Sequence, residues 1–391
     1  MKNCNKENRI PVVLFVADLP HMGGSVLSLK DMILSLGNRI KPIVIVSAKG
    51  ETYDYFCAAN IETYIVPFKL RICVNKHRIL LLPRLLASTA KYYYLNWKGN
   101  RVIKRILRGR EIDIIHSNTC VIDFGYKLSL YYNIPHVWHI REMLDTFDNT
   151  YYLGSYRILR KKMESTNKLI FISNACKDYW NLNTNEKAVS VIGDAVISER
   201  EKSSICPKDR YFLFCSQRLS DFKGSHIALR AFGKSGLGKI GYRLKFIGKY
   251  SNKYKRQLDD ISNYFGIRDS VDYLGMQNHI QIKQYMSKAI AFLQCSKMEG
   301  LGRTVIEAMF YGCPVIAKNC GGTLDFVFHN DTGFLWNNEE ECAELMKQII
   351  NKDISKLTIN AQAYVMKNYS IEHYGEKIMN VYNELLNGKR S

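Results

Sequence analysis

The sequence predicts an α/β protein with two Rossmann-like domains, each a doubly wound parallel sheet, that face a central cleft. Its 391 residues exceed what one hydrophobic core usually holds and suit two domains of about 150–200 residues. Short runs rich in β-branched and aromatic residues are apolar at every position, as expected for strands buried on both faces of a sheet. The stretches between these runs are long enough for crossover helices, which is typical of repeated βαβ units.

In the first half of the chain, continuous apolar runs predict the strands of one sheet. These runs are residues 12–17, 43–48, 63–67, 112–116, 136–140, 169–173 and 189–192. In open parallel sheets, ligands bind outside the carboxyl ends of the strands. The residues that follow each run are therefore candidates for a site.

The second half repeats this scheme. Strands are expected at residues 211–216, 244–248, 271–275, 291–294 and 314–317, and helices at 225–232, 254–264, 280–287 and 304–311. The polar stretch 193–208 between the halves is typical of a hinge. We therefore expect one domain over residues 1–195, a second over 196–370, and a terminal helix over 371–391 that packs back toward the first domain.

The composition excludes several classes of protein. Hydrophobic residues make up 47% of the sequence and charged residues 24%, as in ordinary globular enzymes. No apolar run reaches the ~18 residues needed to cross a bilayer. The eleven cysteines form no Cys-x-x-Cys pair, and no histidine–cysteine cluster has zinc spacing. We expect reduced thiols in the cytosol, no metal site and no membrane span.

The positive charge is concentrated in one segment. The net charge is +20, and residues 69–110 contain twelve Lys or Arg and no Asp or Glu. Such a segment attracts polyanions, either nucleic acid or an anionic membrane surface. Because the chain has neither zinc-finger spacing nor an aromatic RNA-binding signature, we expect no nucleic-acid partner.

The strongest local signal is the segment 298–309, MEGLGRTVIEAM, which follows a predicted strand. A helix begins inside it, and the N–H groups of its first turn, at Gly302, Arg303 and Thr304, suit a diphosphate. The carboxylates of Glu299 and Glu307 can accept hydrogen bonds from sugar hydroxyls. Taken alone, the segment is also compatible with a capped helix that carries a surface glutamate.

A second signal is the segment 215–224, CSQRLSDFKG, where a predicted strand runs out into a loop. Arg218 and Lys223 stand five residues apart at this carboxyl end. Cations at a cleft can neutralise the charge that builds up on a departing diphosphate. The alternative is that these two loop cations are only exposed to solvent and bind no ligand.

Two weaker signals lie in the first half. A Gly-Gly turn, Gly23-Gly24, follows the first strand and leads into a helix, but it is not the G-x-G-x-x-G dinucleotide fingerprint. His139 lies near the carboxyl end of the run 136–140, where strand alternation places it on one face with Arg141 and opposite Trp138. A lone histidine is often only a core residue, and this position gives it weight as a cleft residue.

In this order, the four segments resemble glycosyltransferase family 4, the large retaining group 1 type with the GT-B fold. The family's two glutamates, separated by seven residues, are matched by Glu299 and Glu307. Further matches are Arg218-Leu219 with Lys223-Gly224, Phe246-Ile247-Gly248, Tyr273-Leu274-Gly275, Gly312-Cys313-Pro314-Val315-Ile316, Gly321-Gly322, Gly23-Gly24 and His139. The resemblance spans residues 10–385 and is looser in the first half. Departures are Gln217, Gly193-Asp194-Ala195 and Asp325.

The resemblance implies a role for each domain and residue. The first domain would bind the acceptor and the second the nucleotide-sugar donor. Arg218 and Lys223 would hold the donor diphosphate, Glu299 would contact the transferred sugar, and His139 would lie near the reacting centre. The donor site would further include Gly23, Gly24, Gly248, Gly302, Arg303, Thr304 and Glu307. The family needs no essential metal or other cofactor, since cations can do this charge work.

The basic segment suggests where the acceptor lies. Arg101, Lys104, Arg105 and Arg108 recur at helical spacing on one face, opposite Val102, Ile103, Ile106 and Leu107, and Gly109 ends the helix. A docked helix with a basic outer face explains this pattern. So does a helix that lies on anionic lipid, which the nearby Tyr92–Tyr94 and Trp97 favour. We expect an enzyme peripherally associated with the cytoplasmic face of the membrane.

The sequence thus predicts a retaining, metal-independent glycosyltransferase. It would transfer a sugar from a UDP- or GDP-sugar to a saccharide or lipid-linked saccharide in cell-surface polysaccharide biosynthesis. The alternatives are a catalytically inactive nucleotide-sugar-binding relative, or another nucleotide-sugar enzyme of the same fold. The donor sugar, the linkage and the oligomeric state are not encoded in any motif, because a few pocket side chains set specificity.

Overall fold

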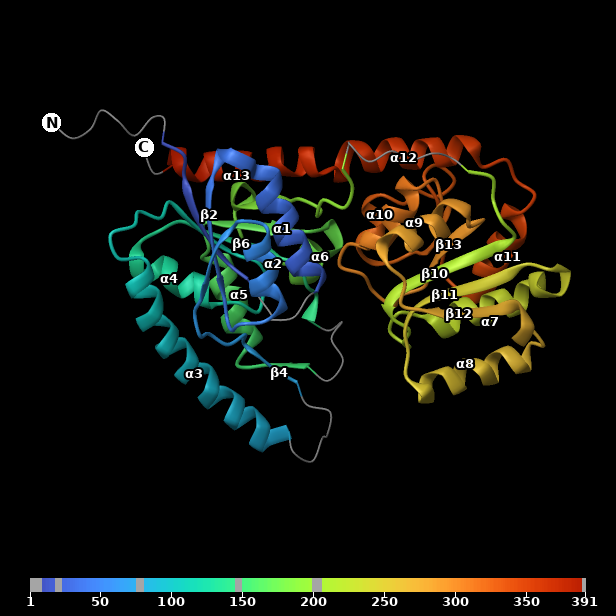
Figure 1. Ribbon diagram of the computed structural model, residues 1–391, viewed down its shortest axis with the longest axis horizontal. Helices are drawn as coiled ribbons and strands as arrows, with labels where there is room; N and C mark the ends of the chain where they lie inside the picture. Colours follow the sequence, from blue (N-terminus) through green and yellow to red (C-terminus); the bar gives the residue numbers. More distant parts are fainter. Residues whose placement is uncertain (1–8, 18–22, 75–80, 145–149, 199–205, 389–391) are drawn as a thin grey trace. The chain divides into compact units, whose positions relative to one another are not determined.

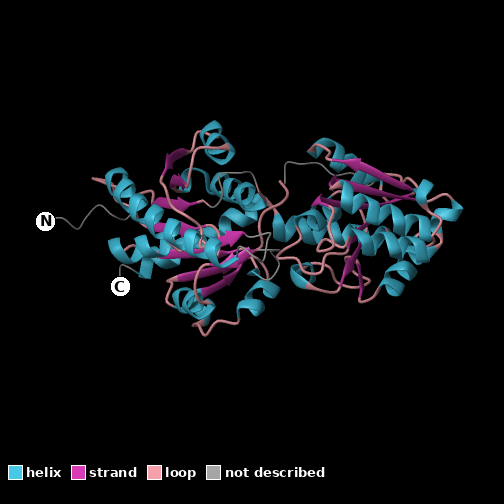
Figure 2. Cartoon of the chain, turned by 90° about the horizontal axis from the view of Figure 1, so that it is seen from below, coloured by secondary structure: helices cyan, strands magenta, loops and turns pink. Residues whose placement is uncertain are grey.

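The computed structural model describes residues 9–17, 23–74, 81–144, 150–198 and 206–388 (Figure 1). The chain forms two compact units. The first combines Met1–Ala195 with Ile371–Ser391, and the second is Val196–Ser370. Each unit contains a parallel sheet whose strands run between helices (Figure 2). The predicted α/β class with two Rossmann-like sheets is therefore confirmed.

Unit 1 is built on a seven-stranded parallel sheet of order β3-β2-β1-β5-β6-β8-β9. The strands are β1 (Val12–Val16), β2 (Lys41–Val46), β3 (Glu62–Ile65), β5 (Ile114–Ser117), β6 (His136–Ile140), β8 (Lys168–Phe171) and β9 (Val189–Val191). Helices α1 (Gly24–Leu36), α2 (Glu51–Ala58), α3 (Leu81–Ile106), α4 (Phe124–Tyr132), α5 (Tyr156–Glu164) and α6 (Asn174–Trp180) connect or flank them. The sheet centre is apolar on both faces, since Val13 and Phe15 are as fully buried as Leu14 and Val16.

Helix α13 (Ile371–Gly388) belongs to this first unit and packs against α1. Its residues Tyr374, Ile378, Val381 and Tyr382 are buried in the same core as β1 and α1. The two helices approach closely because Gly375 has no side chain, and a Cβ there would come within 2.6 Å of the Ser35 carbonyl oxygen. Tyr382 also reaches the sheet, where its hydroxyl lies 2.7 Å from His116 Nδ1.

Unit 2 has a six-stranded parallel sheet of order β12-β11-β10-β13-β14-β15. The strands are β10 (Tyr211–Arg218), β11 (Arg243–Lys249), β12 (Val271–Gly275), β13 (Ala291–Gln294), β14 (Val315–Lys318) and β15 (Phe334–Trp336). The helices are α7 (Ser225–Ser235), α8 (Asn252–Tyr264), α9 (His279–Lys288), α10 (Arg303–Phe310), α11 (Glu339–Ile349) and α12 (Ser355–Tyr369). Every strand and helix expected in this half is present within a few residues.

Three short strands were not predicted. β4 (Ile72–Val74) and β7 (Thr150–Tyr152) form an antiparallel pair in unit 1, and β15 forms an edge of the sheet in unit 2. Each has three residues, which is too short for a periodic pattern. The β4–β7 pair joins segments far apart in sequence, so no local signal marks it.

Candidate functional site

In unit 2, the strand order reverses between β10 and β13, which places a topological switch point there. The two segments singled out in the sequence follow these neighbouring strands. The loop after β10 contains Lys223, and the loop after β13 contains Glu299. In open α/β sheets, ligands bind in the crevice that such a reversal leaves at the carboxyl ends of the strands.

The two loops meet through an ion pair. Lys223 Nζ lies 2.7 Å from Glu299 Oε1, and Ser296 donates a hydrogen bond of 2.6 Å from its hydroxyl to the same oxygen. The pair is open to solvent on one side, because 34% of the Lys223 side chain and 19% of the Glu299 side chain are exposed. A ligand can therefore reach a positive and a negative group that are already oriented.

Glycines allow these loops to approach backbone to backbone. Gly224 has φ +73°, and a Cβ there would lie 1.9 Å from the Cys295 carbonyl oxygen. A Cβ on Gly322 would lie 2.1 Å from the Gly300 carbonyl oxygen, and its N–H donates to the Glu299 carbonyl oxygen at 2.8 Å. The loops after β10, β13 and β14 are thus locked together around the ion pair.

Helix α10 begins beside this pair. Gly302, at φ +94°, precedes it and supplies no side-chain cap, so Arg303 and Thr304 form the first turn. A helix start of this kind attracts phosphate. Glu307 follows one turn later and is half-buried. Burial, and after it the Glu307 carboxylate, raise the pKa of Cys215 to about 12, which places Glu307 near the end of β10.

The remaining predicted residues of unit 2 frame the same edge. Arg218 is the last residue of β10, where it pairs with Lys249 of β11, and its side chain is exposed. Gly248, at φ +145°, lets β11 pass close to β10, because a Cβ there would lie 2.3 Å from the Ser216 carbonyl oxygen. The structure thus brings together the Lys223 loop, the Glu299 loop and the start of α10. Arg218 lies at the end of β10, the strand that precedes the Lys223 loop.

In unit 1, His139 lies in β6 and is completely buried. Its Nδ1 lies 3.4 Å from Arg141 Nη2, and its Nε2 lies 4.0 Å from Asp194 Oδ1. Arginine has no acceptor, so Nδ1 accepts and the ring proton sits on Nε2. Among the described residues, no group accepts a hydrogen bond from this Nε2. His139 is therefore a neutral donor with an unused N–H.

Arg141 is held by Asp194 and by the end of β5. Its guanidinium forms a very short ion pair with Asp194, and Nε donates to the Asn118 carbonyl oxygen at 3.1 Å. Asn118 in turn donates to the Ser25 carbonyl oxygen at the start of α1, at 3.0 Å. A Cβ built on the preceding Gly24 would meet no described atom within 4 Å, so the backbone there faces open space.

Comparison with known proteins identifies this arrangement. Residues 196–366 match the family model described as Glycosyl transferases group 1. This match assigns unit 2 to the group 1 glycosyltransferases. This is the retaining family 4 that the sequence motifs resemble, so that prediction is confirmed.

Individual relatives of this chain are distant. It is 28% identical over 195 residues to "Alpha-1,3/1,6-mannosyltransferase ALG2" of Dictyostelium discoideum, which covers 45% of this chain and 46% of that protein. The chain spans about half the length of several curated relatives that it matches.

Solved structures confirm the GT-B fold. A crystal structure of HepE from Anabaena in complex with UDP has a TM-score of 0.75 at 20% identity, covering 95% of this chain and 99% of that one. The lipopolysaccharide outer core galactosyltransferase WaaB in its apo form has a TM-score of 0.71 at 16% identity, covering 96% and 99%. At these identities the likeness establishes the fold alone.

Sequence reasoning missed some residues that shape the candidate sites of the two units. Ser296 orients Glu299, but nothing distinguishes it in sequence from other serines. Gly321 and Gly322 were noted only as family elements, and the structure shows that their backbone carries the Glu299 loop. Asp194 was noted as a departure from the family pattern, yet it is the partner of the buried Arg141.

The buried histidines of unit 1 predict a stability that depends on pH. Burial lowers the pKa of His116 and His139 well below the ordinary value, and that of His136 to about 3. All three stay neutral when folded and take up protons when unfolded below about pH 6.5. The free energy of unfolding should therefore fall as pH decreases from 6.5, with a slope approaching ~4 kcal/mol per pH unit.

Urea denaturation between pH 7.5 and 5 measures this slope. Replacing His116 with Asn should remove about one third of it, because one of three proton-linked groups is lost. The matched control is Leu130→Asn, a change at an exposed side chain of unit 1 that carries no titrating group and should leave the slope intact. A flat profile from pH 7.5 to 5 would show that these histidines do not stay neutral.

Proposed function

We propose that this chain is a retaining glycosyltransferase that transfers a sugar from a UDP- or GDP-sugar to a saccharide or lipid-linked saccharide acceptor, in cell-surface polysaccharide biosynthesis. The observation that carries the proposal is the Lys223–Glu299 pair beside the start of α10 at the switch point of unit 2. The lysine and the helix start can bind a diphosphate, and the glutamate carboxylate can accept hydrogen bonds from a sugar.

Each group has a part in the proposed reaction. Lys223 and Arg218 counter the charge that develops on the departing nucleoside diphosphate, and the first turn of α10 binds its phosphate oxygens. Glu307 accepts hydrogen bonds from the ribose hydroxyls, and Glu299 from the transferred sugar. Among the described residues, no carboxylate is clearly placed to act as a nucleophile. In the proposed mechanism the donor's own phosphate oxygen therefore accepts the proton of the incoming hydroxyl. The sugar passes through an oxocarbenium-like state.

Unit 1 is the proposed acceptor domain. His139 offers a buried N–H at the carboxyl half of β6, and Gly23 and Gly24 leave open space where α1 begins. A neutral imidazole there can donate to a hydroxyl without adding charge. The structures of HepE with UDP and with UDP-glucose favour a UDP-sugar as the first donor to test.

The proposed acceptor carrier is a lipid, with the enzyme held peripherally on the cytoplasmic face of the membrane. Among the described residues, no helix is both long and apolar enough to span a bilayer. Helix α3 instead exposes Leu82, Leu86, Tyr93 and Trp97, beyond which lie the exposed Arg101, Lys104, Arg105 and Arg108. Such a helix suits an anionic interface. Tyr92 was wrongly included in this surface, because it is buried and bonds to Asp123.

Nucleotide binding tests the donor site. Thermal shifts with UDP, GDP and ADP should show one nucleotide that stabilises the wild type by about 2.7 kcal/mol at a hundredfold excess over Kd. Lys223→Ala should lower the affinity for that nucleotide at least tenfold, because a charged hydrogen bond to phosphate contributes about 1.5–3 kcal/mol.

The matched control is Lys239→Ala, an exposed lysine that precedes β11 and so lies at the opposite edge of the same sheet. It should bind nucleotide as the wild type does. If none of the nucleotides shifts the folded wild type, the proposal fails and an inactive relative becomes the better description. If Lys223→Ala and Lys239→Ala bind alike, the assignment of the site fails.

A further inference from the structure

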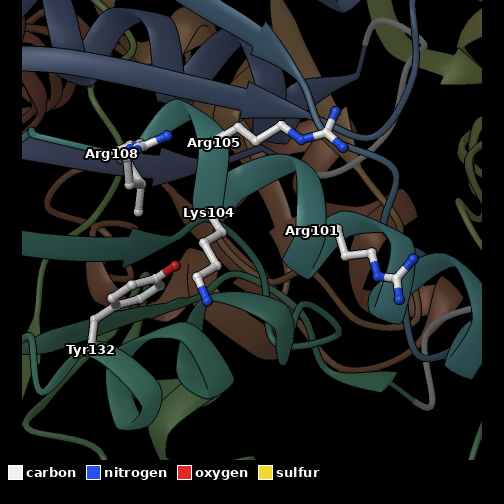
Figure 3. Close-up of a pocket in the computed structure, with 6 residues that line it drawn as sticks. Arg101, Lys104, Arg105, Arg108 and Tyr132 are labelled. Carbon is white, nitrogen blue, oxygen red and sulfur yellow. The ribbon is translucent and has the colours of Figure 1, made fainter.

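A separate hollow lies on unit 1 at the end of α3. It encloses about 660 Å³ and is lined by Arg101, Lys104, Arg105, Leu107, Arg108 and Tyr132 (Figure 3). Lys104 extends toward Tyr132, while the side chains of Arg101 and Arg105 extend away from it. The lining therefore joins cations from one helix to a hydroxyl and an aromatic ring from another.

This hollow is at the edge of the sheet opposite the candidate acceptor residues. The end of α3 leads to the start of β5, and Tyr132 ends α4 shortly before β6 begins. The lining thus lies where strands of unit 1 start. Gly24 and Asn118, in contrast, follow the carboxyl ends of β1 and β5. The hollow belongs to neither predicted substrate site.

The cations around the hollow have no acidic partners. In the part of the chain that the structure describes, no carboxylate forms an ion pair with Arg101, Lys104, Arg105 or Arg108. The neighbouring acidic residues are already engaged: Glu62 pairs with Arg110 at 2.5 Å, and Glu111 and Asp113 both pair with Arg9. Four like charges therefore share one concave surface without compensation.

A helix end explains only part of this charge. Cations in the last turn of α3 are favourable because the helix carboxyl end is negative. That effect is confined to the last turn, whereas Arg101 lies more than a turn before Ile106. It also gives no reason for a concave lining. An anionic ligand would relieve the repulsion among all four groups.

The chemistry of the lining favours phosphate. Guanidinium forks match phosphate oxygens in pairs, and a lysine adds a flexible point charge. Tyr132 supplies a hydroxyl that is protonated at neutral pH, as a tyrosine ordinarily is, and burial, and next Tyr131, raise its pKa further. Its ring and Leu107 add an apolar wall that a bare ion would not use. The lining suits a phosphate group attached to an organic body.

We propose that this hollow is a binding site for a phosphate group carried on a larger molecule, separate from the donor site. Two sources share this chemistry: the headgroup of an anionic phospholipid and a soluble phosphorylated compound. The lipid source rests on the proposed membrane association and would fix how α3 lies on the surface. The soluble source is independent of it.

Vesicle binding tests the lipid source. Co-sedimentation compares vesicles of phosphatidylcholine alone with vesicles containing phosphatidylglycerol. Two double variants remove equal charge from α3 and the turn that follows it: Lys104→Gln with Arg108→Gln at the hollow, and Lys91→Gln with Lys98→Gln at exposed positions outside it. A diffuse patch loses about 1 kcal/mol per cation wherever the cation lies. A defined site makes the hollow variant bind at least tenfold more weakly than the matched control.

Tyr132→Phe sharpens the test because it changes no charge. A defined site predicts at least a threefold loss of affinity, and a diffuse patch predicts none. Inorganic pyrophosphate, added with UDP saturating the donor site, tests the soluble source by thermal shift. It should stabilise the wild type and not the Lys104→Gln/Arg108→Gln variant. Circular dichroism of each variant checks that it is folded.

The outcomes separate the sources. Binding that depends on phosphatidylglycerol and on Lys104, Arg108 and Tyr132 assigns a lipid headgroup. Stabilisation by pyrophosphate that depends on the same residues, without a vesicle preference, assigns a soluble ligand. If the two double variants behave alike and Tyr132→Phe is silent in both assays, the proposal is overturned, although a diffuse membrane contact would stand. Nucleotide binding through Lys223 is measured independently and is unaffected by either result.

Discussion

Replacing Glu299 with Gln is expected to lower the rate of sugar transfer by about 10²-fold or more while leaving nucleotide affinity within a few fold. The variant keeps the shape of the side chain and an acceptor oxygen for Ser296. It loses the negative charge that fixes Lys223 at 2.7 Å and that faces the developing positive charge on the sugar. Because the lost interaction stabilises the transition state more than the bound substrate, kcat should fall by a larger factor than KM changes.

Before the acceptor is known, release of nucleoside diphosphate measures hydrolysis of the nucleotide-sugar, in which water takes the sugar and the same bond to the diphosphate breaks. The control is Glu340→Gln, which breaks an exposed pair with Lys234, 2.6 Å apart, on the same unit. It should leave kcat unchanged. Equal losses in both variants would show that Glu299 acts only through folding. An unchanged kcat in Glu299→Gln would remove Glu299 from the reacting centre.

Replacing Asp123 with Asn is expected to destabilise the protein by about 3–5 kcal/mol. Asp123 is buried in unit 1 with 2% of its side chain exposed. Arg71 and Lys162 lie 2.9 and 2.7 Å from its carboxylate, and the Tyr92 hydroxyl donates to it at 2.6 Å. The neutral amide would leave two partly buried cations without a counter-charge, and that uncompensated charge is the main cost.

Urea unfolding of the wild type and variant measures this loss. The control is Asp272→Asn, which removes the partner of the more exposed Arg243 and should cost less than about 1 kcal/mol. Burial raises the pKa of Asp123, but Lys127 and Lys162 outweigh it, so the net pKa lies below its ordinary value. The stabilisation should therefore be complete above the ordinary pKa of about 4 and be lost as pH falls from there through the lower pKa of the folded state. Similar losses in both variants would contradict this account.

The strands of the two sheets could be predicted from the sequence because each is marked by a run of consecutive apolar residues. The strand 136–140 and the strand 271–275 begin and end where their apolar runs do. The proposed donor residues were also accessible, since glycines and charges directly after a strand mark its carboxyl edge. The ion pair between Lys223 and Glu299 joins residues 76 positions apart, and only the neighbouring order of β10 and β13 brings them together.

Other features had no sequence signal because they depend on distant partners. Asp123 reads as an ordinary helix-capping aspartate, yet its cations come from residues 39 and 52 positions away. Tyr92 sits in a run of tyrosines, and only the direction of α3 shows that it faces inward while Tyr93 and Tyr94 do not. The hollow beside Tyr132 likewise needs the carboxyl ends of two helices, α3 and α4, which β5 separates in the sequence.

The place of α13 in unit 1 has a consequence for biosynthesis. Unit 2 is one continuous stretch, Val196–Ser370, and all of it is available as soon as that stretch has left the ribosome. Unit 1 begins earlier in the chain, but its core includes Tyr374, Ile378 and Tyr382. Its apolar face beside α1 therefore stays uncovered throughout the synthesis of unit 2. The domain translated first is the last to be completed, and chaperones would meet it as an open sheet.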